Sequence, residues 1–197
     1  MHPIINTLVD NRVGSDGDGA YLAELIAKDE ISKCLAEYCT GVDRKDFDLF
    51  RSAYHPDAYD DHGIYKGDVP GLIAAIESRH QTIRQSMHFL GTSRIELDGT
   101  KANAETYCLV MQRTDGGPDG DKRISIGCRY LDLLEDRGDG WRIAERTVAY
   151  EWWGEEPCDN EPPMGPEMTQ SVRSKEDALY RIGSMVLASS SSASATL

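Results

Sequence analysis

The stretch QSMHFLGTSRIELDGTKANAETYCLVMQRT, residues 85 to 114, decides how the chain folds. It contains two runs rich in β-branched, aromatic and other apolar residues, separated by the turn signal DGT at 98–100. This pattern predicts a β-hairpin with strands over about 86–98 and 101–114. Two more strand-like runs, 122–136 and 140–153, follow the turn sequences DGGPDGD and EDRGDG. Because short turns join consecutive strands, we expect one antiparallel meander.

The residues before the hairpin read mainly as helices. Apolar residues recur at the three-and-four spacing of one helix face from about Tyr21 onward. They are Leu22, Leu25, Ile26, Ile31, Leu35, Tyr38, Cys39 and Val42. A short helical segment follows near 46–54, then a brief strand within 58–64, then a helix over 68–84 with Asp68 as N-cap and Pro70 in its first turn. Helices followed by a sheet predict an α+β fold with a pocket between the two layers.

The two ends of the chain differ from this central part. Residues 1–19 end in GSDGDGA and are expected to be a flexible entry to a domain over 20–156. Residues 157–197 begin as a Pro-rich linker, continue through a weakly amphipathic segment at 174–188 and end in the low-complexity sequence SSSSASATL. The last part is expected to be disordered.

Composition narrows the class of function. The 197 residues carry a formal net charge of −13, which disfavours nucleic acid and anionic membrane surfaces as partners, since both require positive charge on the protein. We see no signal peptide and no run of membrane-spanning length. The five cysteines form no CxxC motif, so reduced, buried thiols in a cytoplasmic protein are the simplest expectation.

One ionisable ring and one carboxylate stand out as candidate catalytic groups. His88 lies in an apolar strand and shares a face with Leu90, while Asp43 ends the first predicted helix. A buried core histidine and a solvated helix-terminal carboxylate are the plain alternatives. Placed together, however, an aspartate would fix the tautomer of the histidine and stabilise its charged form, which makes the histidine a better base.

A second group of polar residues lies on the later strands and in the loop after the short helix. Arg146 shares a strand face with Val148 and Tyr150, and an arginine there needs an anionic partner, either a ligand or a structural salt bridge. In HPDAYDDHGIYKG, Asp60 and His62 share one face if the segment is extended. The spacing of the acidic and histidine residues matches no compact zinc signature, so we predict that no metal is bound and that Asp60 and His62 line the pocket or bond within it.

These residues resemble those of the SnoaL-like, nuclear-transport-factor-2-like superfamily, over about residues 20–153. Within it, the chain is most similar to the branch of hexachlorocyclohexane dehydrochlorinase, bile acid 7α-dehydratase and scytalone dehydratase. GVD at 41–43 resembles the segment with the catalytic aspartate, and MHFLGT at 87–92 resembles the segment with the catalytic histidine. The run 126–146 resembles the last hairpin, whose arginine falls on Arg146, and Tyr38 falls where relatives place a pocket Lys or Tyr.

The resemblance implies a cone-shaped α+β barrel, of the cystatin-like kind, that works without cofactor or metal. Asp43 and His88 would be catalytic, and the other candidates would contact substrate. These are Tyr38, Arg146, Asp60, His62, Leu90, Cys108 and Tyr150. The expected activity is that of a dehydratase or dehydrohalogenase acting on a hydrophobic, cyclic small molecule, because an Asp-His pair serves proton abstraction.

Two other functions remain open from the sequence. One is an isomerase that uses the same base. The other is a non-catalytic binding or structural subunit, like the small subunit of ring-hydroxylating dioxygenases, since this fold hosts both kinds of protein. Several strands carry large or apolar residues on both faces, which predicts a homo-oligomer, either a trimer or a dimer.

Overall fold

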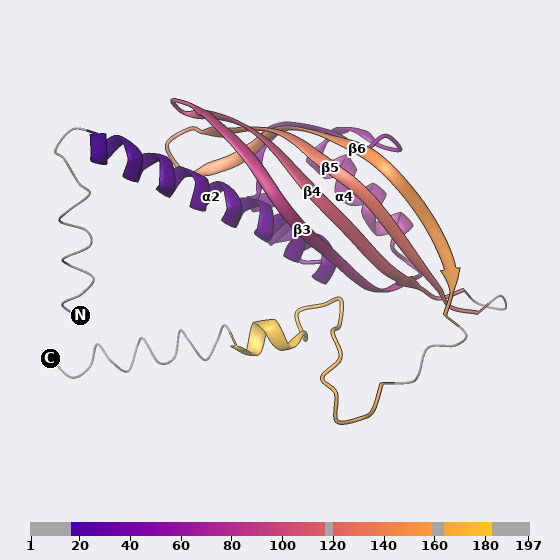
Figure 1. Ribbon diagram of the computed structural model, residues 1–197. Coiled ribbons are helices and arrows are strands. Elements are labelled where there is room, and N and C mark those ends of the chain that lie inside the picture. Colours follow the sequence, from indigo (N-terminus) through magenta and orange to yellow (C-terminus); the bar gives the residue numbers. More distant parts are fainter. Residues whose placement is uncertain (1–16, 117–119, 159–163, 183–197) are drawn as a thin grey trace, which may run out of the picture.

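The computed structural model describes residues 17–116, 120–158 and 164–182. Helices pack against a curved sheet, as Figure 1 shows. The helices are α2 (Gly17–Arg44), α3 (Phe47–Ser52) and α4 (Val69–Arg79). The strands are β1 (Tyr54–Asp61), β2 (Lys66–Asp68), β3 (Ile83–Asp98), β4 (Lys101–Thr114), β5 (Lys122–Asp136) and β6 (Trp141–Pro157). The predicted α+β class is confirmed.

The six strands form one sheet in the order β2-β1-β6-β5-β4-β3. The four long strands from β3 to β6 are the predicted antiparallel meander, while β1 pairs in parallel with β6. The sheet curves without closing, because its edge strands β2 and β3 do not pair. It therefore forms an open cone with α2 and α4 on its concave side (Figure 1).

Side-chain caps set where the shorter helices begin. Asp46 caps α3 by accepting from Leu49 N–H at 3.3 Å, and Asp68 caps α4 by accepting from Gly71 N–H at 2.9 Å. The helix expected over 68–84 ends earlier, at Arg79. Ile83 already pairs with Thr114 of β4. The chain from Ile83 onward therefore belongs to the sheet, and the helix cannot continue to residue 84.

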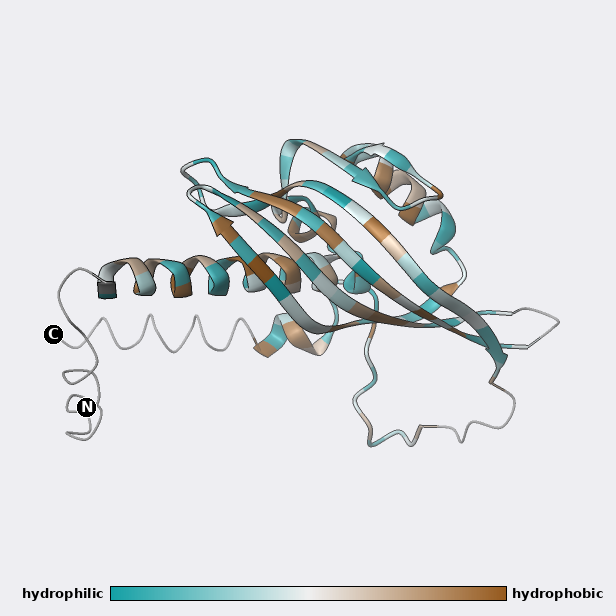
Figure 2. Ribbon diagram, turned by 45° about the horizontal axis from the view of Figure 1, so that its top comes forward, coloured by the Kyte–Doolittle hydropathy of each residue, from teal (hydrophilic) through white to brown (hydrophobic). Residues whose placement is uncertain are grey.

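The core lies between the second half of α2 and the concave face of the sheet. Buried positions on α2 begin at Ile31 and continue through Leu35, Tyr38 and Val42 to its end. The earlier apolar positions of the same stripe, including Leu22 and Leu25, are exposed, because the first turns of α2 project beyond the sheet (Figures 1 and 2). Figure 2 also shows hydropathy alternating along the strands.

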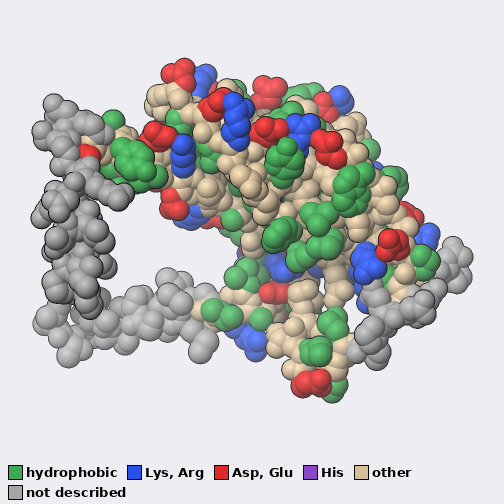
Figure 3. All heavy atoms as spheres, in the orientation of Figure 1, with side chains coloured by type: hydrophobic (Ala, Val, Ile, Leu, Met, Phe, Trp, Pro, Cys, Tyr) green, Lys and Arg blue, Asp and Glu red, His purple; other side chains and the backbone are tan. Residues whose placement is uncertain are grey.

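The convex face of the sheet is open in the single chain and carries large apolar side chains. Figure 3 shows hydrophobic side chains grouped over the strands, with charged side chains of both signs around them. The exposed residues on β3 to β6 include Met87, Phe89, Tyr107, Leu131 and Trp152. The expectation that both faces of these strands carry apolar residues is therefore confirmed.

The chain ends differ from the expected limits of the domain. α2 begins at Gly17, inside the segment expected to be a flexible entry, and β6 reaches Pro157. Residues 164–182 return to the end of α2, and a few helical residues occur at 178–182. The remaining predicted entry at 1–16 and the low-complexity tail lie outside the described residues.

Two further expectations concern the described residues. No helix there is long and apolar enough to cross a membrane. All five cysteines are buried and none forms a disulfide, as predicted.

Candidate active site

A cavity of about 230 Å³ lies between the concave face of the sheet, α4 and the end of α2. Its walls are mostly apolar and include Leu72, Ile76, Val110, Ile126 and Val148. Exposed residues that also border it mark its mouth. They are Ile64, Tyr150 and Trp153. The curvature of the sheet leaves this space, because β1 and α4 stand away from β3 and β4 on the other side of the cone.

Asp43 and His88 meet at one wall of this cavity. His88 Nδ1 lies 2.7 Å from Asp43 Oδ1, and the His88 backbone N–H donates to Oδ2 at 2.8 Å. The hydroxyl of Ser86, two positions earlier on the same face of β3, donates to Oδ1 at 2.6 Å. The His88 ring lines the cavity, whereas Asp43 lies behind it.

The electrostatics of this pair define which nitrogen can act. Burial alone would raise the pKa of Asp43, but attraction to His88 and the hydrogen bonds from His88 and Ser86 outweigh it, so the pKa lies below its usual value. An ionised carboxylate only accepts hydrogen bonds, so Nδ1 of the histidine carries the proton. Nε2 then holds the lone pair that a general base needs.

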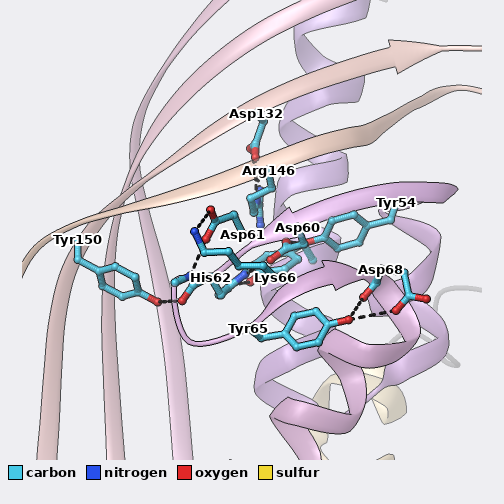
Figure 4. A network of polar contacts seen from close by, with 12 residues as sticks. Tyr54, Asp60, Asp61, His62, Tyr65, Lys66, Asp68, Asp132, Arg146 and Tyr150 are labelled. Carbon is cyan, nitrogen blue, oxygen red and sulfur yellow. Dashed lines mark hydrogen bonds and ion pairs between the residues drawn. The ribbon is translucent and has the colours of Figure 1, made fainter.

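A second chain of polar contacts reaches the cavity from β1. The Tyr38 hydroxyl lies 3.1 Å from Nε2 of His62, and Nδ1 of His62 contacts Asp60. Asp60 is fully buried and also accepts from the Tyr54 hydroxyl at 2.7 Å. Figure 4 shows the Asp60, His62 and Tyr54 side chains converging, with Tyr150 reaching the His62 backbone. Because the Asp60 carboxylate accepts a hydrogen bond from Nδ1–H of His62, Nε2 of His62 accepts from the Tyr38 hydroxyl.

Arg146 lies beneath this chain rather than on the cavity wall. Its guanidinium forms two hydrogen bonds with Asp132, at 2.7 and 2.8 Å, and is fully buried. The same group stacks 4.1 Å from the ring centres of Tyr38 and Tyr130. The salt bridge that the sequence left as an alternative is thus present, and Arg146 touches the cavity only through the two tyrosines. Its Nη1 has no hydrogen-bond partner in the described part of the chain.

The remaining predicted residues divide between the cavity and its surroundings. Tyr150 lines the cavity and donates from its hydroxyl to the His62 carbonyl at 3.1 Å. Leu90 borders a surface groove beside α2. Cys108 is buried, with Sγ 3.6 Å from the Tyr130 hydroxyl. Neither Leu90 nor Cys108 is among the residues that line the cavity.

Several residues at the site were not singled out from the sequence. Ser86, Gln112, Tyr130 and Asp132 each point to the concave face. Side chains two positions apart on a strand share a face, and this rule relates these residues to one another. Ser86 is two positions from His88, and Asp132 is two positions from Tyr130. Within the residues that the structure describes, no three His, Cys, Asp or Glu side chains group to hold a metal ion.

Comparisons with known proteins agree with the fold. A solved hexachlorocyclohexane dehydrochlorinase of Novosphingobium barchaimii superimposes with a TM-score of 0.59 and 18% identity, covering 76% of this chain and 99% of that one. A scytalone dehydratase-like protein of Novosphingobium aromaticivorans gives a TM-score of 0.60 at 15% identity, covering 77% and 99%. At such identities the likeness concerns the fold alone.

Sequence comparison extends this likeness to a family. An uncharacterized protein of Mycobacterium tuberculosis is 27% identical over 137 residues, which cover 64% of this chain and 86% of that protein. The model of the SnoaL-like domain matches residues 23–147, a range that runs from α2 into β6 and includes Asp43, His88 and most of the residues that line the cavity. The chain therefore belongs to the SnoaL-like domain family.

Proposed function

We propose that this protein is a cofactor-independent lyase of the dehydratase or dehydrohalogenase type. The observation that supports this most is the 2.7 Å contact between Asp43 and His88 at the wall of an apolar cavity. A binding module has no need for a histidine whose tautomer is fixed by a buried carboxylate. A base that removes a proton from carbon does need one.

The proposed reaction begins at Nε2 of His88, which takes a proton from a substrate carbon. The electrons of the broken C–H bond form a new double bond to the neighbouring carbon, and the leaving group departs with its own bonding pair as hydroxide or halide. Asp43 stabilises the imidazolium that results. The Tyr38 hydroxyl lines the cavity and can turn from Nε2 of His62 to donate its proton to a departing oxygen, which leaves as water.

The volume of the cavity and its apolar walls limit the size and polarity of the substrate. Drug-sized ligands occupy pockets of about 300–1,000 Å³, whereas this cavity measures about 230 Å³. A single-ring hydrophobic molecule therefore suits the enclosed space better than a fused four-ring one. The apolar walls exclude water, which strengthens the hydrogen bonds of His88 and Tyr38 during the reaction.

The test of this function uses single-ring substrates bearing a hydroxyl or halide next to an acidic C–H bond. Product formation is followed by the absorbance of the new double bond or by halide release. We expect His88→Ala to lower kcat by about 10²–10⁴-fold, the usual contribution of a general base. Asp43→Asn should also lower it, because an amide can donate to Nδ1 and favour the wrong tautomer.

His55→Asn is the matched control, since His55 is a buried histidine that contacts the Glu135 carbonyl at 2.9 Å and does not line the cavity. It should keep near-normal turnover. Equal turnover by His88→Ala and the unaltered protein would overturn the proposal. Deuterium uptake without loss of the leaving group would indicate an isomerase, and tight binding without either reaction would indicate a binding subunit.

We also propose that the protein acts as a homo-oligomer, a dimer or a trimer. The support is the exposed apolar face on β3 to β6, which includes Phe89 and Trp152. Patches of this kind on a monomer mark contact surfaces.

A further inference from the structure

Residues 164–182 form a strap that returns from β6 to the junction of α2 and α3. At this junction the Tyr180 hydroxyl donates to Asp46 Oδ2 at 2.8 Å, and Lys175 pairs with the same carboxylate. Arg44 Nε lies 3.4 Å from Asp177 Oδ2. Figure 1 shows this segment crossing below the end of α2. The strap is therefore anchored by polar contacts from several of its residues.

Arg173 makes the contacts of the strap that lie nearest the Asp43–His88 pair. Its guanidinium donates to the backbone carbonyls of Val42 at 2.9 Å, Asp43 at 3.1 Å and Ile83 at 3.2 Å. Its Nη2 also donates to Nδ1 of His80 at 2.9 Å. One side chain thus joins the ends of α2 and α4 to the beginning of β3.

These acceptors explain why an arginine is suited to this position. The last carbonyls of a helix lack partners within the helix and carry partial negative charge, so a cation with several donors stabilises them. The planar guanidinium offers five N–H donors in a fixed fork, whereas a lysine offers one flexible point charge. Arg173 therefore fixes the last turn of α2 relative to β3, which are the two elements that carry Asp43 and His88.

On the side away from the cavity, the strap forms part of the wall beside the pair, whose side chains are only 8% (His88) and 9% (Asp43) exposed. Asp43 and His88 border a surface groove together with Asp177 and Leu179 of the strap. Water that approached the Asp43 carboxylate from this side would compete for the hydrogen bond to His88. The strap lies beyond the residues that the SnoaL-like domain model matches, 23–147.

We propose that Arg173 is a positioning residue for the Asp43–His88 pair, and that the strap keeps this pair aligned and shielded from solvent. The structural claim stands on the contacts alone, while its catalytic consequence rests on the proposed function. Arg173 does not border the cavity, so it acts through Asp43 and the ends of α2 and β3 rather than on the substrate.

The test compares Arg173→Gln with Lys175→Gln in the full chain. Both variants remove one positive charge from the strap, but Lys175 contacts Asp46 and not the pair. The readout is the NMR signal of the His88 ring Nδ1–H in protein labelled with ¹⁵N-histidine. We expect Arg173→Gln to speed exchange of this proton with water by about ten-fold or more and to lower kcat by a similar factor with KM unchanged.

Lys175→Gln should leave the exchange rate within about two-fold of the unaltered protein, and Arg173→Lys should be intermediate, since it keeps the charge and loses the fork. If Arg173→Gln does not fold, Arg173→Lys alone must show faster exchange for the proposal to survive. A lower Tm with unchanged His88 signals would show a merely structural role and overturn it. If the exchange changes as expected while His88→Ala leaves turnover intact, the proposed function fails and the positioning role stands.

Discussion

His80 ends α4 with an imidazole that its surroundings keep neutral. α4 ends at Arg79, so the His80 ring turns inward and accepts from Arg173. Burial first, and then the positive charges of Arg173, His88 when protonated, Lys45 and Arg79, lower the pKa of His80 to about 3.

This shift predicts a dependence of stability on pH. In the unfolded chain His80 has its ordinary pKa of 6.5, so below that pH the unfolded state binds a proton that the folded state does not. The free energy of unfolding should therefore fall as the pH drops from 6.5 towards 3, by at most about 1.4 kcal/mol per pH unit from this group. Urea denaturation between pH 6.5 and 4.5 measures it, because Asp43 and Asp46, whose pKa values are lowered, stay ionised there.

His80→Asn supplies the comparison, since an amide oxygen can accept from Arg173 but does not titrate in this range. The pH dependence should be flatter in this variant. Identical slopes for both proteins would show that His80 is not the responsible group.

At the scale of elements, the contact between α2 and α3 depends on a residue without a side chain. A Cβ added to Gly41 would lie 2.6 Å from the backbone nitrogen of Phe50 and 2.7 Å from its Cα. The two helices approach each other this closely because Asp46 N–H donates to the Gly41 carbonyl at 2.9 Å. Asp43 follows two residues later, so this contact also sets where the last turn of α2 lies.

We expect Gly41→Ala to lower the free energy of unfolding by about 1–3 kcal/mol, because backbone atoms of α3 must shift. Gly19→Ala is the control in the same helix, where an added Cβ meets nothing within 4 Å. It should be neutral or stabilise by up to about 1 kcal/mol, through helix propensity. Thermal and chemical denaturation of both variants measure the difference. Similar losses from both would mean that helix propensity and not the close approach governs this position.

Elements with clear turn signals were the most predictable part of the fold. β4 and β5 occupy the expected ranges because DGT, DGGPDGD and EDRGDG bound them. The end of α4 was not predictable, because Thr82 and Ile83 fit a helical pattern in the sequence. In the structure Ile83 pairs with β4 instead. The contact of Asp43 with His88 was expected only from the family resemblance. The Asp132 partner of Arg146 was missed, because strand register and not sequence spacing places Asp132 opposite it.

At the scale of the whole molecule, the convex face of the sheet predicts self-association. Light scattering after size exclusion should show a dimer or trimer at micromolar concentration, because self-association would bury the exposed apolar side chains of β3 to β6. Phe89 is 61% exposed on this face, and Phe89→Glu should shift the population towards monomer without loss of fold.

Tyr21→Ser is the matched control, since Tyr21 is 62% exposed on the projecting end of α2. A monomeric unaltered protein would contradict the prediction. Dissociation by Tyr21→Ser and not by Phe89→Glu would place the interface on the helix instead.

The sequence did not predict that the strap returns to α2. Its main contacts run from Arg173 to backbone carbonyls, and every residue has a carbonyl, so no residue pattern marks the acceptors. The Pro-rich composition before it indicated a linker and nothing about where the linker leads.

The parallel pairing of β1 with β6 has a consequence during protein synthesis. β1 is synthesised before its long partner β6, which is the last of the described strands to be made. At about 5–20 residues per second, β1 waits on the order of ten seconds with that edge unpaired. Unpaired edges invite association with other chains, and proline and charged residues discourage it. β1 contains both kinds of residue, namely Pro56, Asp57 and Asp61. These residues disfavour pairing of the β1 edge with other chains until β6 has been synthesised.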